Sequence, residues 1–304
     1  MNDVLLKALS YVAIILIGFV LKKCGYFRQS DYKILNTVVF NVTLPAAVLS
    51  NLGKFRFDPS LLLLAPMGLL FNFLASLAGH LLSRKRSLAD RALFTINLPG
   101  FNIGAFVLPL VQTFLGPAAM VSICLFDVGN AVMCTGGNLA AATLFVGGRQ
   151  SFHPAEMAKK LLRTLGFSVY FIFVPMAMLN LSLPLPIKTL VDVVAPANGV
   201  MAMLMLGVAM GIHFNREYLS RSGWLLLGRY GVAAVLALAC YFLLPFPLVT
   251  RQALTLCLLA PLSSMATYQT ELLGGDPGMA SFANTLSIPI SLCIIVPLIT
   301  VMVS

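Results

Sequence analysis

The chain of 304 residues is 59% hydrophobic and only 10% charged. A soluble domain carries roughly 25% charged residues because its surface faces water, so this composition excludes a soluble protein and indicates helices that face lipid. The net charge of +10 lies in short basic runs between apolar segments. That pattern is typical of loops retained in the cytoplasm, and it argues against a nucleic-acid-binding surface.

A membrane helix needs about 20 mainly apolar residues to cross the hydrocarbon core. On that criterion the sequence predicts an all-α integral membrane protein with ten transmembrane helices. In chain order the spans are residues 4–21, 33–53, 60–83, 92–115, 118–146, 165–183, 188–211, 223–244, 252–273 and 279–302. The first span is followed by Lys22 and Lys23 and by no small-residue cleavage site, so we interpret it as a helix and not as a signal peptide.

The Lys and Arg residues predict the orientation of these spans. The loops after spans one, three, five and seven hold Lys22, Lys23, Arg28, Lys33, Arg84, Lys85, Arg86, Arg91, Arg149, Lys159, Lys160, Arg163, Arg216 and Arg221. The opposite side holds Lys7, Lys54, Arg56, Lys188 and Arg251. Basic loops stay in the cytoplasm. The sequence therefore predicts a multi-pass protein of the inner (cytoplasmic) membrane with both termini outside.

The spans divide into two sets of five that carry similar breaks. A linker over 150–164 separates residues 1–149 from residues 165–304. Because each half has an odd number of spans, the second half begins on the opposite side of the membrane, so any repeat must be inverted. Span two has Asn41 four residues before Pro45, and span seven has Asp192 four residues before Pro196. Spans four and nine carry Leu98-Pro99-Gly100 and Ala260-Pro261.

Proline lacks an N–H and opens the helix ladder. Freed backbone groups at membrane depth are tolerated only where they face protein or a watery cavity. Paired breaks in two inverted halves therefore indicate the binding site of a transporter, where the positive end of a half-helix can bind a carboxylate.

Few ionisable residues lie deep in the spans, and each is costly there. Asp127 and Asn130 are three residues apart in span five and share one helix face. Both are candidates for ion coupling. Asp127 could bind a proton or a cation, with structural hydrogen bonding as the alternative. Arg229 lies six residues inside span eight, and we expect it to reach the cytoplasmic edge.

The sequence carries no motif of a known enzyme site. A P-loop, HExxH and GxSxG are absent, and the six cysteines show no metal-ligand spacing. We therefore expect no enzyme activity, no metal and no cofactor. Without a nucleotide site, transport would be driven by gradients of the solute or of H⁺ or Na⁺.

Three segments resemble the auxin efflux carrier family, which includes plant PIN proteins and bacterial transporters of malonate, malate and similar acids. They are Asn41-Val-Thr-Leu-Pro45, the run from Phe101 to Leu110, and the run from Pro261 to Pro277. The chain is similar to the bacterial members because a long cytoplasmic loop is missing. Val107 replaces the second glycine of the family's span-four segment, which would narrow the cavity.

The resemblance implies a fold related to that of the bile acid/sodium symporters. Spans one, two, six and seven would form a scaffold, through which a homodimer would form. Spans three to five and eight to ten would form a core that moves like an elevator, with spans four and nine broken where they cross. Carried onto this chain, the substrate-binding candidates are Asn41, Thr43, Pro99, Asn102, Gly104, Pro261, Ser263, Ser264 and Tyr268.

The predicted function is secondary active transport of a small organic anion, a mono- or dicarboxylate, by alternating access. A channel or uniporter for a small solute is the nearest alternative. A membrane-embedded sensor or enzyme is a further alternative, although the chain offers no catalytic cluster and its loops are short.

Overall fold

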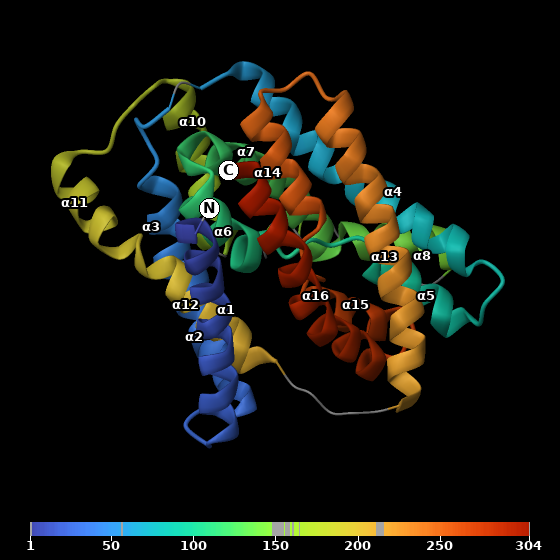
Figure 1. Ribbon diagram of the computed structural model, residues 1–304. Coiled ribbons are helices and arrows are strands. Elements are labelled where there is room, and N and C mark those ends of the chain that lie inside the picture. The colour runs from blue at the N-terminus through green and yellow to red at the C-terminus, as the bar shows by residue number, and fades with distance from the viewer. Residues whose placement is uncertain are drawn as a thin grey trace.

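The protein is described from a computed structural model (Figure 1). The structure describes residues 2–55, 57–147, 161–163, 165–210 and 216–303, together with positions 155 and 159. The predicted linker 150–164 lies mostly outside these residues, as do Arg56, Arg149 and Lys160. Within them the regular structure is helical, apart from one isolated antiparallel bridge between Phe101 and Leu262.

The helices follow the predicted spans closely. Before the linker they are α1 (Asn2–Lys23), α2 (Tyr32–Val38), α3 (Leu44–Leu49), α4 (Leu64–Ser83), α5 (Leu88–Asn97), α6 (Leu108–Phe114), α7 (Gly116–Val132) and α8 (Asn138–Val146). After it they are α10 (Leu165–Met178), α11 (Leu185–Val194), α12 (Ala197–Ala209), α13 (Arg216–Leu243), α14 (Leu248–Leu258), α15 (Met265–Leu272) and α16 (Pro277–Val303). Short 3-10 and π-helical segments complete several spans, at Gln29–Asp31, Val39–Thr43, Pro59–Leu63, Ile103–Val107 and Met133–Gly137.

Length and apolar composition make this a multi-pass membrane protein. Among the described residues, seven helical regions are long and apolar enough to cross a membrane: Val4–Lys23, Tyr32–Leu49, Pro59–Ser83, Gly116–Val146, Leu185–Ala209, Tyr218–Leu243 and Pro277–Val303. Shorter apolar helices, Ile103–Phe114 and Leu165–Met178, lie within predicted spans four and six, and Leu248–Leu258 overlaps the start of predicted span nine. The total of ten spans and their division into inverted halves stay predictions.

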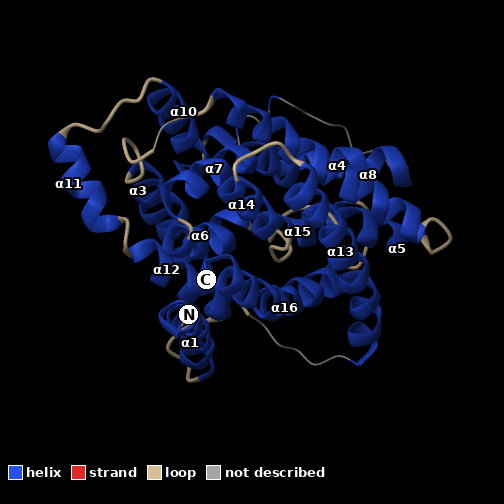
Figure 2. Cartoon of the chain, turned by 45° about the horizontal axis from the view of Figure 1, so that its top comes forward, coloured by secondary structure: helices blue, strands red, loops and turns tan. Residues whose placement is uncertain are grey.

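The helices lie in two groups that Figures 1 and 2 show on opposite sides. The α1 group comprises α1, α2, α3, α10, α11 and α12, and the α4 group comprises α4, α5, α7, α8, α13, α14, α15 and α16. Helix α6 packs against both α7 and α12. The groups draw helices from both halves of the chain, so each depends on contacts between distant segments.

Glycine pairs bring the backbones close within each group. A Cβ at Gly18 of α1 would lie 2.5 Å from the carbonyl oxygen of Leu204, and one at Gly207 of α12 would lie 2.1 Å from that of Ile15. In the same way, Gly68 of α4 and Gly129 of α7 face one another's helix backbones. Small residues allow this approach, and van der Waals packing then replaces the hydrophobic effect that lipid cannot supply.

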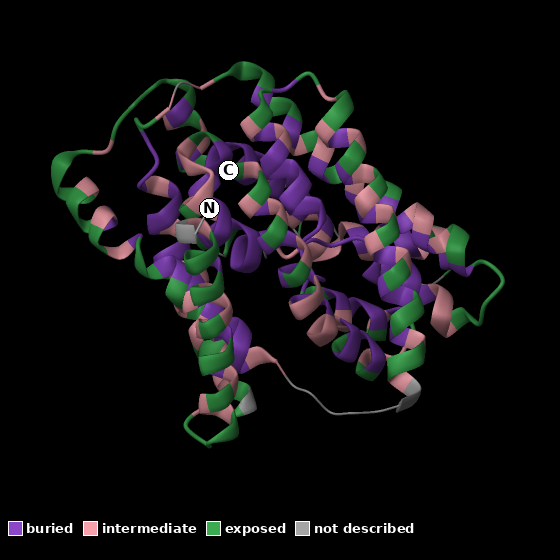
Figure 3. Ribbon diagram, in the orientation of Figure 1, coloured by how far each residue is buried: buried purple, intermediate pink, exposed green. Residues whose placement is uncertain are grey.

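Burial follows the same division (Figure 3). Buried side chains gather where the two groups meet and inside the α4 group, and α7 is buried along most of its length. Large apolar side chains on the outer faces stay exposed, for example Leu190 and Val193 of α11. On a membrane protein such faces contact lipid.

The two similar proline motifs of spans two and seven differ in structure. Ala195 and Pro196 separate α11 from α12, so span seven is broken there. Span two runs on through the π-helical segment Val39–Thr43 into α3, whose first turn contains Pro45. Both arrangements follow from the N–H that proline lacks, but only one interrupts the helix.

Candidate functional site

The breaks of spans four and nine cross and pair with one another. Between α5 and the π-helical segment Ile103–Val107, the N–H of Asn102 donates to Pro261 O at 3.0 Å. Between α14 and α15, the N–H of Ser263 donates to Gly100 O at 3.1 Å. Gly100 has φ of +78°, which glycine adopts without the steric cost that a side chain would add. The structure thus brings together the two breaks that the sequence singles out.

Buried polar side chains satisfy the backbone of the crossing in span four. Asn72 of α4 accepts from the N–H of Gly100 at 2.7 Å. Asn130 of α7 accepts from the N–H of Phe101 at 3.1 Å and donates to Phe101 O at 2.9 Å. Each of these backbone groups would otherwise be an unpaired buried group at membrane depth.

Helix α16 holds the crossing segment of span nine in a similar way. Ser287 Oγ accepts from the N–H of Leu262 at 3.0 Å. Ser291 Oγ donates to Leu259 O at 2.8 Å. Serine hydroxyls can do this because they accept and donate at once.

Arg229 of α13 binds the carboxyl ends of both broken helices. Its guanidinium donates to six backbone carbonyls at 2.6–3.1 Å, those of Asn97, Leu98, Pro99, Gly100, Ala260 and Pro261. The side chain is 1% exposed, and its Cζ lies 5.4 Å from the centroid of the Phe101 ring. A helix leaves its last carbonyls unpaired, with partial negative charge at that end. One planar cation therefore neutralises two helix termini.

This finding corrects the expectation for Arg229. The sequence position predicted a side chain that reaches toward the cytoplasmic edge. Instead the guanidinium points into the protein, between the two breaks, and packs against the ring of Phe101.

The opposite, positive ends of the half-helices begin at the same crossing. The segment Ile103–Val107 starts after Asn102, and α15 starts after Ser264. Neither Asn102 nor Ser264 caps its helix with its side chain. Both side chains are thus available to a ligand, next to N–H groups that favour negative charge.

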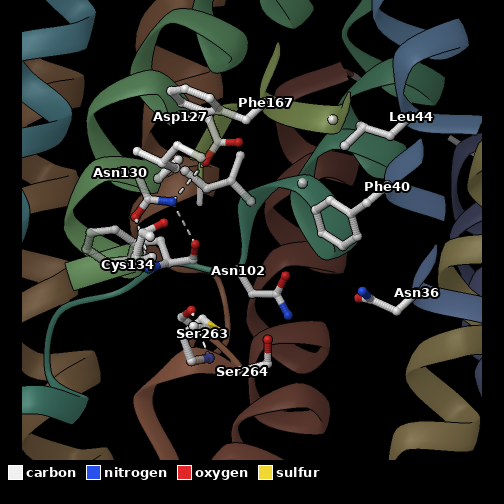
Figure 4. A pocket seen from close by; sticks show the side chains of 18 of the residues that line it. Asn36, Phe40, Leu44, Asn102, Asp127, Asn130, Cys134, Phe167, Ser263 and Ser264 are labelled. Atoms are coloured by element: carbon white, nitrogen blue, oxygen red, sulfur yellow. Dashed lines mark hydrogen bonds between the residues drawn. The ribbon is translucent and has the colours of Figure 1, made fainter. Parts of the chain in front are cut away.

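A cavity of about 430 Å³ lies beside the crossing, between the two helix groups (Figure 4). Asn36, Phe40 and Leu44 of span two lie on one side in Figure 4, and Asp127, Asn130 and Cys134 lie on the other. Asn102 and Ser264 lie between these walls. The remaining lining residues are Thr37, Asn41, Phe101, Ile103, Gly104, Ala131, Thr135, Leu161, Arg163, Gly166, Phe167, Tyr170, Ser263 and Met265.

Most of the predicted site residues line this cavity: Asn41, Asn102, Gly104, Asp127, Asn130, Ser263 and Ser264. Others do not. Pro99 and Pro261 lie at the breaks and present their carbonyls to Arg229. Thr43 donates to Asn198 Oδ1 at 3.0 Å, which links span two to α12. Tyr268 is 52% exposed on α15. The geometry of these four offers no support for direct contact with a ligand in the cavity.

Asp127 lies in the wall of the cavity and is 9% exposed. Its Oδ1 accepts from Asn130 Nδ2 at 2.8 Å, and its Oδ2 accepts from the hydroxyl of Tyr170 at 3.0 Å. The described salt bridges, Lys188–Asp192 and Arg221–Asp90, do not include it. Among the described lining residues one carries a positive charge: Arg163, an exposed residue in the turn before α10.

Sequence reasoning missed several lining residues. Asn36 and Phe40 precede the proline motif of span two, and Tyr170 lies in a span with no polar pattern, so no local signal marked them. Val107, expected to narrow the cavity, is fully buried and is not among the described lining residues. In the part of the chain that the structure describes, no group of three His, Cys, Asp or Glu could hold a metal ion.

Apolar helices, two paired breaks and a polar cavity between two helix groups define a membrane transporter. The comparisons agree with this class. Residues 4–143 match the family described as membrane transport protein. A protein of Methanothermobacter thermautotrophicus named uncharacterized transporter is 25% identical over 217 residues, which are 69% of this chain and 68% of that protein. Both findings support a membrane transporter and agree with the resemblance to the auxin efflux carrier family that the motifs carry.

Proposed function

We propose that the protein is a secondary active carrier that moves a small organic anion, a mono- or dicarboxylate, across the cytoplasmic membrane by alternating access. The observation that carries this proposal is the cavity into which both half-helix amino termini open, at Asn102 and at Ser264. The cavity volume of about 430 Å³ falls within the range of small-molecule sites.

The electrostatics of the crossing favour an anion. A helix amino terminus carries the equivalent of roughly half a positive charge. The compensating negative ends face Arg229, on the side of the breaks where the six carbonyls are bound. The amino-terminal N–H groups, Asn102 and Ser264 therefore form a site with donors in excess, which suits a carboxylate.

The cavity borders the ends of helices that the basic loops assign to the cytoplasm. Asn36 and Thr37 lie in the first turns of span two, Arg163 lies two residues before α10, and Gly166 lies in its first turn. We infer an inward-facing state, with both termini outside. Alternating access would move the α4 group as a core against the α1 group as a scaffold, and the scaffold would form a homodimer. The two inverted five-span halves would be residues 1–149 and 165–304.

Coupling to an ion gradient would use Asp127. A carboxylate substrate and the Asp127 carboxylate in one cavity repel one another, because the surroundings have a low dielectric constant. A bound H⁺ or Na⁺ would remove that repulsion. Asn130 would transmit the change, since it binds both Asp127 and the crossing backbone.

Counterflow in proteoliposomes tests the proposal. Vesicles loaded with unlabelled acid should accumulate the same labelled acid transiently, because a carrier exchanges one molecule for another. The Asn102→Ala variant should lose this accumulation, and Asn51→Ala should keep it, because Asn51 is buried outside the cavity and bonds Ala47 O. A channel or uniporter remains the second candidate. A channel would equilibrate the acid without counterflow. A uniporter would show counterflow, but an imposed ion gradient would not drive its uptake of the acid.

A further inference from the structure

We propose that Asp127 and Tyr170 form a proton-operated latch between the two helix groups. While Asp127 is ionised, its hydrogen bond to Tyr170 holds the groups in the arrangement seen here, and a proton taken from the cavity weakens that bond. The inference rests on the proposed function, in which the α4 group moves against the α1 group. It adds Tyr170 to the residues of the proposed coupling mechanism and names the proton as the coupling ion.

The bond joins one group to the other. Asp127 lies on α7 of the α4 group, and Tyr170 lies on α10 of the α1 group. The hydroxyl donates to Oδ2 at 3.0 Å, and Tyr170 is 3% exposed. A hydrogen bond to an ionised acceptor is roughly twice as strong as one between neutral groups. Movement between the groups must therefore break or weaken a strong buried bond.

Asp127 also connects to the crossing. Asn130 Nδ2 donates both to Asp127 Oδ1 at 2.8 Å and to Phe101 O at 2.9 Å. Phe101 directly precedes Asn102, whose side chain lines the cavity. A continuous chain of contacts thus leads from Tyr170 through the carboxylate to the residue beside the proposed substrate.

The partners of the carboxylate favour a proton over a metal ion. Both neighbours, Asn130 Nδ2 and the Tyr170 hydroxyl, are hydrogen-bond donors to it, whereas hard cations require several oxygen ligands. A proton on Oδ2 needs no new ligand, because the hydroxyl can rotate and accept in turn. The proton can come from water in the cavity, since Asp127 lines it.

Among the described residues, the other titratable groups around Asp127 are thiols and one cation. They are Cys124 on α7 itself, Cys134 in the following π-helical segment, Cys257 on α14, and Arg163, an exposed residue that lines the cavity. From α4, which also packs against α7, Gly68 and Ala65 face the helix. A change between mildly acid and mildly alkaline pH is therefore expected to act on Asp127 through its bond to Tyr170.

The test compares Tyr170→Phe with Tyr11→Phe in proteoliposomes. Tyr11 of α1 also bonds across to the crossing span, at Thr113 Oγ1 (2.6 Å), but not to a carboxylate, so it is the matched control. Wild type should transport faster at acid than at alkaline pH. Tyr170→Phe should raise the alkaline rate and reduce the acid-to-alkaline ratio by at least about fivefold, with KM within about twofold. Tyr11→Phe should keep the wild-type ratio.

An unchanged ratio in folded Tyr170→Phe, or an equal loss in Tyr11→Phe, would overturn the latch. If Tyr170→Phe does not fold, Asp127→Asn serves instead, since an amide cannot ionise. The counterflow of this variant, expressed relative to its own rate at acid pH, should not change with pH, and a wild-type profile would also overturn the proposal. Absence of counterflow in the wild type would instead contradict the proposed function.

Discussion

The side-chain amide of Asn130 binds both backbone polar groups of Phe101, with Oδ1 at 3.1 Å from N and Nδ2 at 2.9 Å from O. Phe101 is the residue of span four that bridges to Leu262 of span nine. One buried side chain therefore fixes the backbone at the point where the two broken spans meet. Asn130 is 2% exposed, although it also lines the cavity.

Removing this amide should destabilise the crossing. In Asn130→Ala the N–H and C=O of Phe101 lose their partners, and each unsatisfied buried group costs about 1–3 kcal/mol. We expect the apparent melting temperature in detergent to fall by at least about 5 °C. Asn284→Ala is the control, since Asn284 makes one long bond of 3.3 Å to Ser263 O. An equal loss in both variants would contradict a special role for Asn130.

Every replacement of Arg229 should reduce the stability of the protein. Arg229→Lys keeps the charge but loses the planar fork that reaches carbonyls of both breaks. Arg229→Gln also removes the charge that neutralises two helix ends. We expect stability in the order wild type, Arg229→Lys, Arg229→Gln, with the last costing about 3 kcal/mol or more.

Thermal unfolding in detergent measures this order. Arg221→Lys is the comparison, because its ion pair with Asp90 is partly exposed and such pairs contribute about 0–1 kcal/mol. If Arg229→Gln has the same melting temperature as the wild type, the guanidinium does not stabilise the carbonyls of the two breaks.

The crossing could be predicted from the sequence because its residues carry a local signal. Pro99, Gly100 and Pro261 lie in spans that are otherwise apolar, and helix breaks at membrane depth have few uses. Asn102, Ser263 and Ser264 directly follow these breaks, so their position at the cavity follows from the same motifs.

The role of Arg229 could not be predicted in this way. Its place in span eight gives a depth along the helix but not the direction in which the side chain points. That direction follows from the packing of α13 against the next helix, α14, and against α5, whose last residues lie more than a hundred positions earlier in the chain. Tyr170 and Asn36 were missed for the same reason, since each faces the cavity through tertiary packing alone.

Cys134 should report on the state of the cavity. It lines the cavity and is partly exposed, whereas Cys124, Cys240 and Cys257 are buried. In a background where the exposed Cys24 and Cys293 are replaced by Ala, a thiol reagent added from the cytoplasmic side should label Cys134. A bound substrate should slow that labelling, measured by mass spectrometry. Labelling at the same rate with and without any transported acid would contradict the placement of the substrate.

Gly104 should set the distance between the crossing and span two. A Cβ at this position would lie 3.2 Å from Phe40 Cε1 and 3.6 Å from Leu44 Cδ2. We expect Gly104→Ala to reduce transport modestly and Gly104→Val to reduce it at least about tenfold, because β-branched bulk must displace the Phe40 ring. Phe40→Ala combined with Gly104→Val should restore part of the rate.

The control for this series is Gly231→Val on α13, where a Cβ meets nothing within 4 Å. Uptake rates in proteoliposomes, normalised to folded protein, provide the comparison. A Gly104→Val variant with the wild-type rate would show that the groups do not meet at this position during transport.

The most direct test of the account is calorimetric titration of mono- and dicarboxylates into the purified protein. It should be run with wild type, Asn102→Ala and Asn51→Ala, with and without sodium and across pH. We expect at least one acid to bind the wild type and Asn51→Ala with the same affinity, and Asn102→Ala to bind it at least about tenfold more weakly, a loss of about 1.4 kcal/mol. Equal affinity in Asn102→Ala would contradict a substrate site at the crossing of spans four and nine.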